Sequence, residues 1–389
     1  MILILSIILK HKVIIIVNTR LLIKDKLDGI GWFTFETLKR ITQKNPGHIF
    51  YFLFDRTFSD EFVFSDNIIP VVLKPKARHP FLWYYWFEFK VAGFINKVKP
   101  DLFLSPDGYL SLRTNVRSLA VIHDINFFHR PKDLPFFSRL YYNRYFPKFA
   151  RKSCRIVTVS EFSKQDIATS YGIDPNKIDV VYNGAHKIYK PIDNDRKQII
   201  KEKYSDGKDY FVFIGSMHPR KNITGLFNAF NTFKNETGSD FKLIIVGSKF
   251  FMTKAIEKAF SVSEFKKDII FTGRLNPEDL HVVLAGANCL TFIPFYEGFG
   301  IPVIEAFNCD VPVICSDKTS LPEVAGEAAL FVDPNDIQTV KNAMKSITQD
   351  DVLRNNLINA AKIQREKYNW DYTAEMLWNS ILKCIAIHP

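Results

Sequence analysis

Cysteine is scarce in this sequence. The 389 residues include five cysteines, an odd number at irregular spacing and without a Cys-x-x-Cys pair. Such a set does not form a disulfide framework, and it lacks the paired thiolates that hold a structural zinc ion. We therefore expect neither feature, and a reducing compartment fits this cysteine usage best.

Long apolar runs are also missing. A membrane-spanning helix needs about 20 consecutive apolar residues, whereas the largely apolar stretch from Met1 to Leu9 is much shorter. Charged residues follow this stretch, although a signal peptide carries its charge before the apolar region. We expect a short extension ahead of a first buried strand, and a protein that is soluble or peripheral to a membrane.

The composition, 47% hydrophobic and 24% charged, is that of a globular protein and excludes a disordered or fibrous one. The length predicts two domains. Lys and Arg exceed Asp and Glu by 13 over residues 1–190, whereas the net charge of residues 191–389 is −2. One basic domain therefore suggests an anionic partner: nucleic acid, an anionic membrane surface or a phosphate-bearing substrate.

Short apolar, β-branched runs alternate with helical patterns along the chain. Continuous apolar runs are typical of parallel strands that are buried on both faces. The runs are 13–17, 49–54, 102–104, 119–122, 156–159 and 178–181 in the first half, then 211–214, 242–246, 269–271, 289–293, 311–315 and 329–332. This alternation, repeated in both halves, predicts an α/β protein with two doubly wound Rossmann-like domains.

A polar stretch near residues 187–209 predicts the junction, so we expect an N-terminal domain over 1–190 and a C-terminal domain over 191–389. The stretch contains Asp193-Asn194-Asp195, which resembles a metal-binding Asp-x-Asp motif. Because it lies in a polar linker and not at a strand end, we interpret it as solvated charge. No other cluster has the spacing of metal ligands, and we expect no required metal.

The segment from Pro294 to Ala306 follows a predicted strand and precedes a predicted helix. Backbone N–H groups at such a helix start attract phosphate, and carboxylates suit vicinal hydroxyls because they accept two hydrogen bonds at once. The candidate binding residues are Glu297, Gly298, Phe299, Gly300, Ile301 and Glu305. The alternative is a glycine-containing turn with an exposed glutamate.

Two adjacent cations, Arg220 and Lys221, follow the strand end at Gly215-Ser216. Arg can clamp a diphosphate through two hydrogen bonds and Lys adds a point charge, although a solvated pair is the common alternative. His123 ends a strand beside Asp124, a position that is also compatible with a structural role.

Gly29 and Gly31 precede a helix and permit close approach of a phosphate or an acceptor. A plain turn between strand and helix is a serious alternative for them.

Together these segments resemble the family-4 retaining glycosyltransferases with the GT-B fold, from about Val13 to Asp333. The residues that carry the resemblance are Glu297-x7-Glu305, Asp28-Gly29-Ile30-Gly31, Val121-Ile122-His123-Asp124, Val159–Ser163, Val181–Gly184, Pro219-Arg220-Lys221-Asn222, Ser320–Val324 and Ala328–Asp333. The resemblance implies two Rossmann-like domains facing a central cleft. It also implies a final helix, about 370–389, that crosses back to the N-terminal domain.

The resemblance also implies roles. Glu305 would bind the ribose hydroxyls of a nucleotide diphosphate sugar, and Glu297 and His123 would face the transferred sugar. Arg220 and Lys221 would bind the diphosphate, beside Gly215 and Ser216, where some relatives carry a further Arg. The Pro-Arg-Lys-Asn block is common among mannosyltransferase-like members and favours GDP-mannose as co-substrate, with no cofactor required.

The predicted function is retaining transfer of a hexose to a glycan or lipid-linked saccharide acceptor in cell-surface polysaccharide synthesis. We expect it at the cytoplasmic face of the cell membrane. The alternatives are a GT-B sugar-nucleotide epimerase, a glycan phosphorylase or a non-catalytic module that binds a nucleotide sugar. The two glutamates with the Arg-Lys pair argue against the last of these.

Residues 127–155 combine eight Lys and Arg with nine Phe and Tyr and a single acid, and residues 81–87 are also rich in aromatics. Cations and aromatic rings together suit an anionic membrane surface. Nucleic acid could use the same chemistry, but we do not expect it as a partner, and some of these rings could belong to the core.

Overall fold

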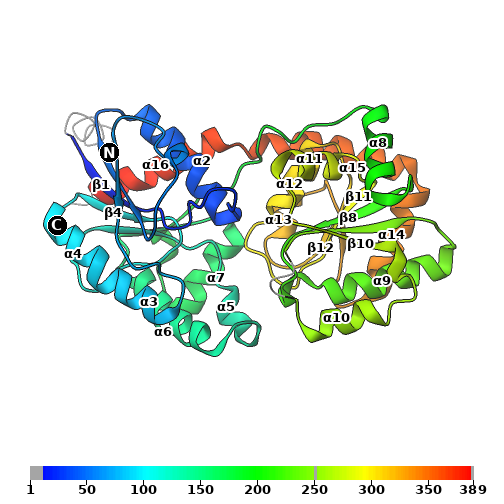
Figure 1. The fold of residues 1–389 in the computed structure, drawn as a ribbon, viewed down its shortest axis with the longest axis horizontal. Coiled ribbons are helices and arrows are strands. Elements are labelled where there is room, and N and C mark those ends of the chain that lie inside the picture. The colour runs from blue at the N-terminus through cyan, green and yellow to red at the C-terminus, as the bar shows by residue number, and fades with distance from the viewer. Residues whose placement is uncertain (1–11, 249–251, 387–389) are drawn as a thin grey trace. The chain divides into compact units, whose positions relative to one another are not determined.

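The computed structural model describes residues 12–248 and 252–386, and it divides into two compact units (Figure 1). Unit 1 contains the described residues up to Asn183 and those from Trp370 onward, and unit 2 is Gly184–Asn369. The boundary therefore lies between residues 183 and 184 and not at 190, and the final helix groups with unit 1. The expected extension Met1–Leu9 lies outside the described residues.

Unit 1 is built on a sheet of seven parallel strands in the order β3-β2-β1-β4-β5-β6-β7. The strands are β1 (Ile14–Asn18), β2 (Ile49–Phe54), β3 (Ile68–Val72), β4 (Leu102–Ser105), β5 (Ser118–Val121), β6 (Arg155–Thr158) and β7 (Ile178–Val180). Apart from the edge strand β3, where Ile69 and Val72 are exposed, the apolar side chains of these strands lie mostly inside the unit, as expected for a sheet with both faces covered.

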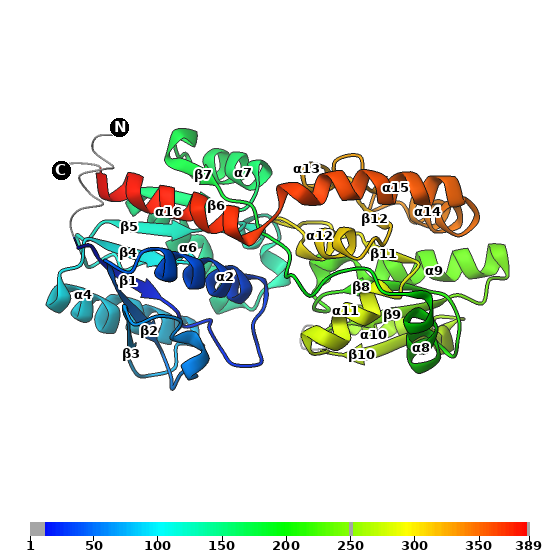
Figure 2. The ribbon, with the colours of Figure 1, turned by 90° about the horizontal axis from the view of Figure 1, so that it is seen from above.

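Helices cover both faces of this sheet (Figures 1 and 2). They are α2 (Gly29–Lys44), α3 (Pro80–Tyr85), α4 (Ala92–Val98), α5 (Asn126–His129), α6 (Phe136–Lys152), α7 (Glu161–Tyr171) and α16 (Trp370–Ala386), with a π-helical turn, Trp86–Val91, between α3 and α4. In Figure 1, α2 and α16 lie on one face, and α3, α4 and α6 lie on the other.

Unit 2 repeats the plan with six parallel strands in the order β10-β9-β8-β11-β12-β13. The strands are β8 (Tyr210–Ile214), β9 (Lys242–Val246), β10 (Ile269–Gly273), β11 (Cys289–Phe292), β12 (Val313–Ser316) and β13 (Leu330–Val332). The helices are α8 (Asn194–Ser205), α9 (Ile223–Thr237), α10 (Lys254–Ser261), α11 (Pro277–Ala285), α12 (Ile301–Asn308), α13 (Leu321–Ala325), α14 (Ile337–Gln349) and α15 (Asp351–Gln364). The predicted α/β class with two Rossmann-like domains is confirmed.

Two local elements differ from the sequence-based expectation. The triplet around Asp193 is not a linker: the Asp193 side chain accepts from the Arg196 N–H at 2.8 Å and caps the start of α8. The edge strand β3 was not expected, because its run is short and contains Pro70. A proline is tolerated at an edge, where no further strand needs its missing N–H.

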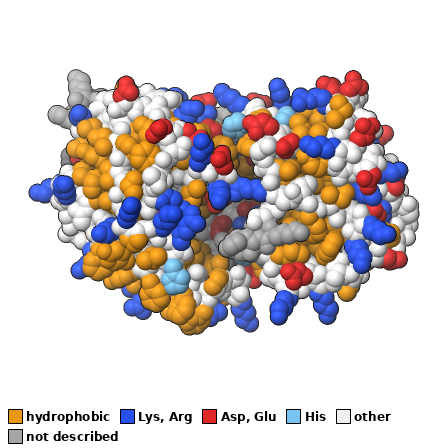
Figure 3. Space-filling model, viewed as in Figure 1, with side chains coloured by type: hydrophobic (Ala, Val, Ile, Leu, Met, Phe, Trp, Pro, Cys, Tyr) orange, Lys and Arg blue, Asp and Glu red, His pale blue; other side chains and the backbone are white. Residues whose placement is uncertain are grey.

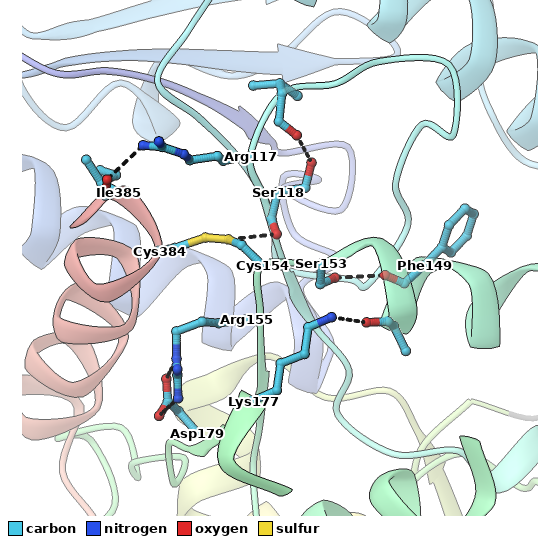
Figure 4. Close-up of a disulfide and its surroundings, with 12 residues drawn as sticks. Arg117, Ser118, Phe149, Ser153, Cys154, Arg155, Lys177, Asp179, Cys384 and Ile385 are labelled. Carbon is cyan, nitrogen blue, oxygen red and sulfur yellow. Dashed lines mark hydrogen bonds and ion pairs between the residues drawn. A yellow bond between two sulfur atoms is a disulfide. The ribbon is translucent and has the colours of Figure 1, made fainter. Parts of the chain in front are cut away.

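One disulfide is present, although it is not a disulfide framework: Cys154 and Cys384 are bonded, with a Cα–Cα distance of 5.8 Å (Figure 4). The bond joins the start of β6 to α16, 230 residues later. The Arg117 guanidinium also donates to the Ile385 carbonyl at 2.7 Å, and Lys383 pairs with Asp179 at 3.1 Å. The last helix is therefore attached to unit 1 by both covalent and polar contacts.

No helix within the two described ranges is long and apolar enough to cross a membrane.

Breaking the disulfide should destabilise unit 1 without unfolding it, because α16 keeps its ion pairs and its packing on α2. We expect Cys384→Ser to lower the free energy of unfolding by about 2 to 4 kcal/mol. Thermal unfolding of oxidised protein with and without a thiol reductant measures this. Reductant should lower the melting temperature of the parent and leave Cys384→Ser unchanged; equal shifts in both proteins would contradict the prediction.

Candidate active site

The strand order of unit 2 points to one place for a ligand. In a doubly wound sheet, ligands bind beyond the carboxyl ends of the strands, where the chain switches from one side of the sheet to the other. In unit 2 the switch lies between the neighbouring strands β8 and β11. The loops that leave these two strands are residues 215–222 and 293–300, which contain most of the residues singled out from the sequence.

The loop after β8 begins at Gly215, which has a φ of +152°. A single turn of 3-10 helix, Pro219–Lys221, then presents the two cations. Asn222 adopts the left-handed conformation, its side chain accepts from the Gly225 N–H at 3.2 Å, and its amide donates to the Pro334 carbonyl at 2.6 Å. Asn222 therefore fixes the turn and caps α9, so its position is explained by local structure.

The loop after β11 joins this turn directly. The Phe295 N–H donates to the Arg220 carbonyl at 2.8 Å, and the Arg220 guanidinium donates to the Tyr296 carbonyl at 3.0 Å. Gly300 has a φ of +98°, and a Cβ there would lie 2.6 Å from the Leu321 side chain. Only glycine fits that position without displacing its neighbour.

Three of the predicted site residues form one ion-pair cluster. Arg220 Nη1 lies 2.7 Å from Glu297 Oε2, and Lys221 Nζ binds the same oxygen. All three side chains are at most 19% exposed, and Lys221 also lies 4.6 Å from the centre of the Phe292 ring. Arg220 and Lys221 precede Glu297 by 77 and 76 positions in the sequence, and both bind the same carboxylate oxygen.

Electrostatics keep this carboxylate ionised. Burial alone would raise the pKa of Glu297, but the charges of Arg220 and Lys221 lower it to about 2. Two cations against one carboxylate leave the cluster with a net positive charge. The arrangement can therefore attract a further anion at the switch point of the sheet.

Two residues that the sequence analysis did not place in the site hold Glu297 from the other side. The Glu297 N–H donates to the Thr319 hydroxyl at 3.2 Å, and the Ser320 hydroxyl donates to the Glu297 carbonyl at 2.9 Å. Thr319 has a φ of +59°, an uncommon conformation for a β-branched residue. They follow the strand β12, and that position was the signal that could have indicated them.

Glu305 lies in α12, away from the ion-pair cluster. Burial raises the pKa of Glu305 to about 7, although a hydrogen bond from Tyr189 opposes part of this rise. Glu305 therefore titrates near neutral pH, whereas Glu297 does not. Of the other predicted residues here, Phe299 is buried and packs against Tyr368 at 5.5 Å, and Ile301 is the first residue of α12.

The remaining predicted residues lie in unit 1. His123 follows β5 and its Nε2 donates to the Pro106 carbonyl at 2.9 Å, so Nε2 carries the proton. Burial lowers the pKa of His123, which keeps the ring neutral and leaves Nδ1 as an acceptor. Gly29 is the first residue of α2, and a Cβ on Gly31 would approach the Leu27 side chain to 3.1 Å.

The switch point of unit 1 holds an ion pair that the sequence analysis missed. Arg20, after β1, donates through Nε to Asp107, after β4, at 2.7 Å, and Asn18 donates to the other oxygen of Asp107 at 2.6 Å. The Pro106 carbonyl that accepts from His123 immediately precedes Asp107. The ion pair therefore holds the loop after β4, whose Pro106 carbonyl accepts the hydrogen bond from His123.

Comparison with known proteins identifies the two units. A sequence model described as "Glycosyltransferase Family 4" matches residues 27–186, and one described as "Glycosyl transferases group 1" matches residues 194–364. The chain belongs to the glycosyltransferases. Unit 1 of this glycosyltransferase carries the first domain and unit 2 carries the second.

Two relatives of this glycosyltransferase match along most of their length. It is 28% identical to O-antigen chain mannosyltransferase B of Escherichia coli, over 90% of this chain and 94% of that protein. It is 29% identical to O-antigen chain mannosyltransferase RfbU of Salmonella typhimurium, over 80% of this chain and 82% of that protein. A glycosyltransferase structure from Rickettsia africae superposes with a TM-score of 0.71 at 17% sequence identity, over 97% of this chain and 100% of that one. The superposition agrees with the predicted GT-B fold.

No group of three potential metal ligands among His, Cys, Asp and Glu lies together in the part of the chain that the structure describes. That the enzyme needs no metal remains a prediction.

The shared oxygen of the cluster makes Lys221 and Glu297 strongly coupled. We expect Lys221→Met to lower the free energy of unfolding by about 1 to 3 kcal/mol, because Glu297 then stays buried with one cation fewer. Adding Glu297→Gln should restore part of this loss, as measured by denaturant unfolding of the four proteins of a double-mutant cycle. The exposed pair Lys203 and Asp279, 3.7 Å apart, serves as the control and should show no measurable coupling.

Proposed function

We propose that this glycosyltransferase transfers mannose from GDP-mannose, with retention at the anomeric carbon, to a glycan or lipid-linked saccharide. The product would be a cell-surface polysaccharide such as an O-antigen chain, made at the cytoplasmic face of the membrane. The observation that carries the proposal is the cluster of Arg220, Lys221 and Glu297 at the switch point of unit 2. Mannose is supported by the Pro-Arg-Lys-Asn block and by the names of the two bacterial relatives.

The diphosphate of the donor would bind between two sources of positive potential. Arg220 can present two parallel N–H groups to phosphate oxygens, and Lys221 adds a compact charge. The first turn of α12 follows Gly298, Phe299 and Gly300, and its backbone dipoles also favour an anion. Gly215 and Ser216 begin the loop that carries Arg220 and Lys221, so they would lie beside the phosphates.

Glu297 would change partners when the donor binds. Without the donor, its carboxylate neutralises part of the charge on Arg220 and Lys221. A diphosphate carries more charge than a carboxylate and would take over both cations. Glu297 would then accept hydrogen bonds from hydroxyls of the transferred sugar.

Glu305 would accept hydrogen bonds from the two ribose hydroxyls. In unit 1, neutral His123 would offer Nδ1 to a hydroxyl of the transferred sugar, and Gly29 and Gly31 would let the backbone approach the acceptor. These assignments extend the family resemblance to the positions observed in each unit.

The reaction needs no protein nucleophile. The bond between the anomeric carbon and the diphosphate oxygen breaks, the acceptor oxygen forms a bond to the same face of that carbon, and the hydroxyl proton moves to the leaving phosphate. Negative charge grows on the diphosphate during this step. Fixed cations and helix N–H groups therefore stabilise the transition state more than the ground state.

Transfer is tested by incubating the enzyme with GDP-mannose and a lipid-linked saccharide, then analysing the product by NMR. We expect an α-linked mannose, the configuration of the donor, and a fall in kcat/KM of about a hundredfold or more for Arg220→Ala. UDP-, dTDP- and ADP-sugars are the matched controls. An epimerised nucleotide sugar without an acceptor product would support the epimerase, and binding without turnover would support the non-catalytic module.

Nucleotide affinity should depend on pH through Glu305. Its pKa of about 7 means that the carboxylate, which accepts more hydrogen bonds than the acid, forms as the pH rises through 7. GDP should therefore bind more tightly at pH 8 than at pH 6, as measured by titration calorimetry. Glu305→Gln has no such titration, so it should bind weakly with a flatter pH profile; an unchanged profile would exclude Glu305 from the ribose site.

A further inference from the structure

Exposed hydrophobic side chains are concentrated on one part of unit 1. Eight of the seventeen large exposed hydrophobics found across the described ranges come from two short segments. They are Phe81, Leu82, Tyr84, Tyr85, Phe89, Phe136, Phe137 and Leu140. Single exposed apolar residues are ordinary, but a contiguous group marks an interaction surface. We call these eight residues the aromatic surface.

The two segments are in contact, so the surface is continuous. The Phe81 ring lies 5.9 Å from that of Phe137, which lies 5.5 Å from that of Phe136. Farther along, Tyr84 lies 6.2 Å from Phe89. Figure 3 shows hydrophobic side chains gathered over the region of α3 and α6. Phe81 and Phe136 are 68% and 60% exposed, which is unusual for side chains of this size.

The interior behind this surface is already filled, so the rings cannot turn inward. Trp83, which lies between the exposed residues of α3, packs on Tyr141 of α6 at 5.4 Å. Tyr141 in turn stacks on Tyr109 at 5.9 Å, and Tyr109 is almost fully buried. The exposed rings therefore lie outside a densely packed aromatic core.

Cations lie over the outer rings. Arg139 lies 5.3 Å from the Phe136 ring, Arg113 lies 4.6 Å from Phe89, and Lys90 lies 5.7 Å from Tyr85. Exposed Arg144 and Lys148 extend the positive charge along α6, which contains no acidic residue. Nearby Glu88 is buried and accepts from the Leu112 N–H at 2.9 Å. The potential of this face is therefore positive.

We propose that the aromatic surface docks unit 1 on a membrane that contains anionic lipid. Rings and leucines would enter the interface while the cations bind headgroups, since aromatic side chains prefer that depth and cations are attracted there. Leucine and phenylalanine together favour lipid over nucleic acid, because aliphatic side chains do not stack on bases. The surface is identified from unit 1 alone, whereas its use in reaching a lipid-linked acceptor rests on the proposed function.

Vesicle flotation tests the proposal with phosphatidylcholine vesicles, alone or with phosphatidylglycerol, and with no donor or acceptor present. The parent should bind only the anionic vesicles, and more weakly at high salt. We expect Arg139→Glu/Arg144→Glu/Lys148→Glu and, separately, Phe81→Ser/Phe136→Ser/Phe137→Ser to reduce binding at least tenfold. Unchanged melting temperatures establish that both variants fold.

Matched changes on unit 2 provide the controls. Arg196→Glu/Lys254→Glu/Lys362→Glu makes the same charge change, and Val262→Ser/Val352→Ser/Ile363→Ser removes apolar groups that are even more exposed. Both should bind as the parent does. Full binding by either unit 1 variant, equal losses in the controls, or tighter binding to a single-stranded oligonucleotide than to the vesicles would overturn the proposal.

Vesicle binding is measured separately from mannose transfer, so the two proposals can fail separately. If the enzyme binds anionic vesicles through this surface but does not transfer mannose, the proposed function fails and the docking surface stands. If transfer occurs and binding is unaffected by the unit 1 changes, the docking surface fails alone.

Discussion

The order of the strands in the two parallel sheets is the constraint on which the rest of the structure depends. In each sheet the chain adds strands on one side of the first strand and then adds the remaining strands on its other side. The loops that leave the two neighbouring strands at this switch point therefore run in opposite directions. In unit 2 those strands are β8 and β11, and their loops carry Arg220 and Glu297. The contact between these distant residues is a consequence of sheet topology, and the loops need only short turns to complete it.

Much of this could be predicted from the sequence, because parallel strands buried on both faces leave continuous apolar runs. The runs at 49–54 and 242–246 coincide with β2 and β9. Motif residues at strand ends, such as His123 and Arg220, could be placed for the same reason. The family resemblance supplied their chemical roles, which composition and periodicity do not contain.

What could not be predicted depends on tertiary contacts. The polar residues around Asp193 suit a solvated linker and a helix cap equally well, and only the packing of α8 on α11 and β9 decides between them. Cys154 and Cys384 lie far apart in the sequence, and their pairing follows from the return of α16 to unit 1. The pKa values of Glu297 and Glu305 move in opposite directions, although both are glutamates of one motif, because only Glu297 has cations beside it.

The ion-pair cluster shows why a buried carboxylate can help a site that binds anions. Two buried cations without a counter-charge would repel each other and would destabilise the fold of unit 2. Glu297 removes most of that cost while leaving a net positive charge, so the cations stay in place before any ligand arrives. Under the proposed function, a diphosphate would replace one oxygen acceptor with several, through a change of partners at one side chain. The Thr319 and Ser320 contacts hold the Glu297 backbone and would keep it fixed during this exchange. Under the proposed function, the same three residues would serve both stability and binding.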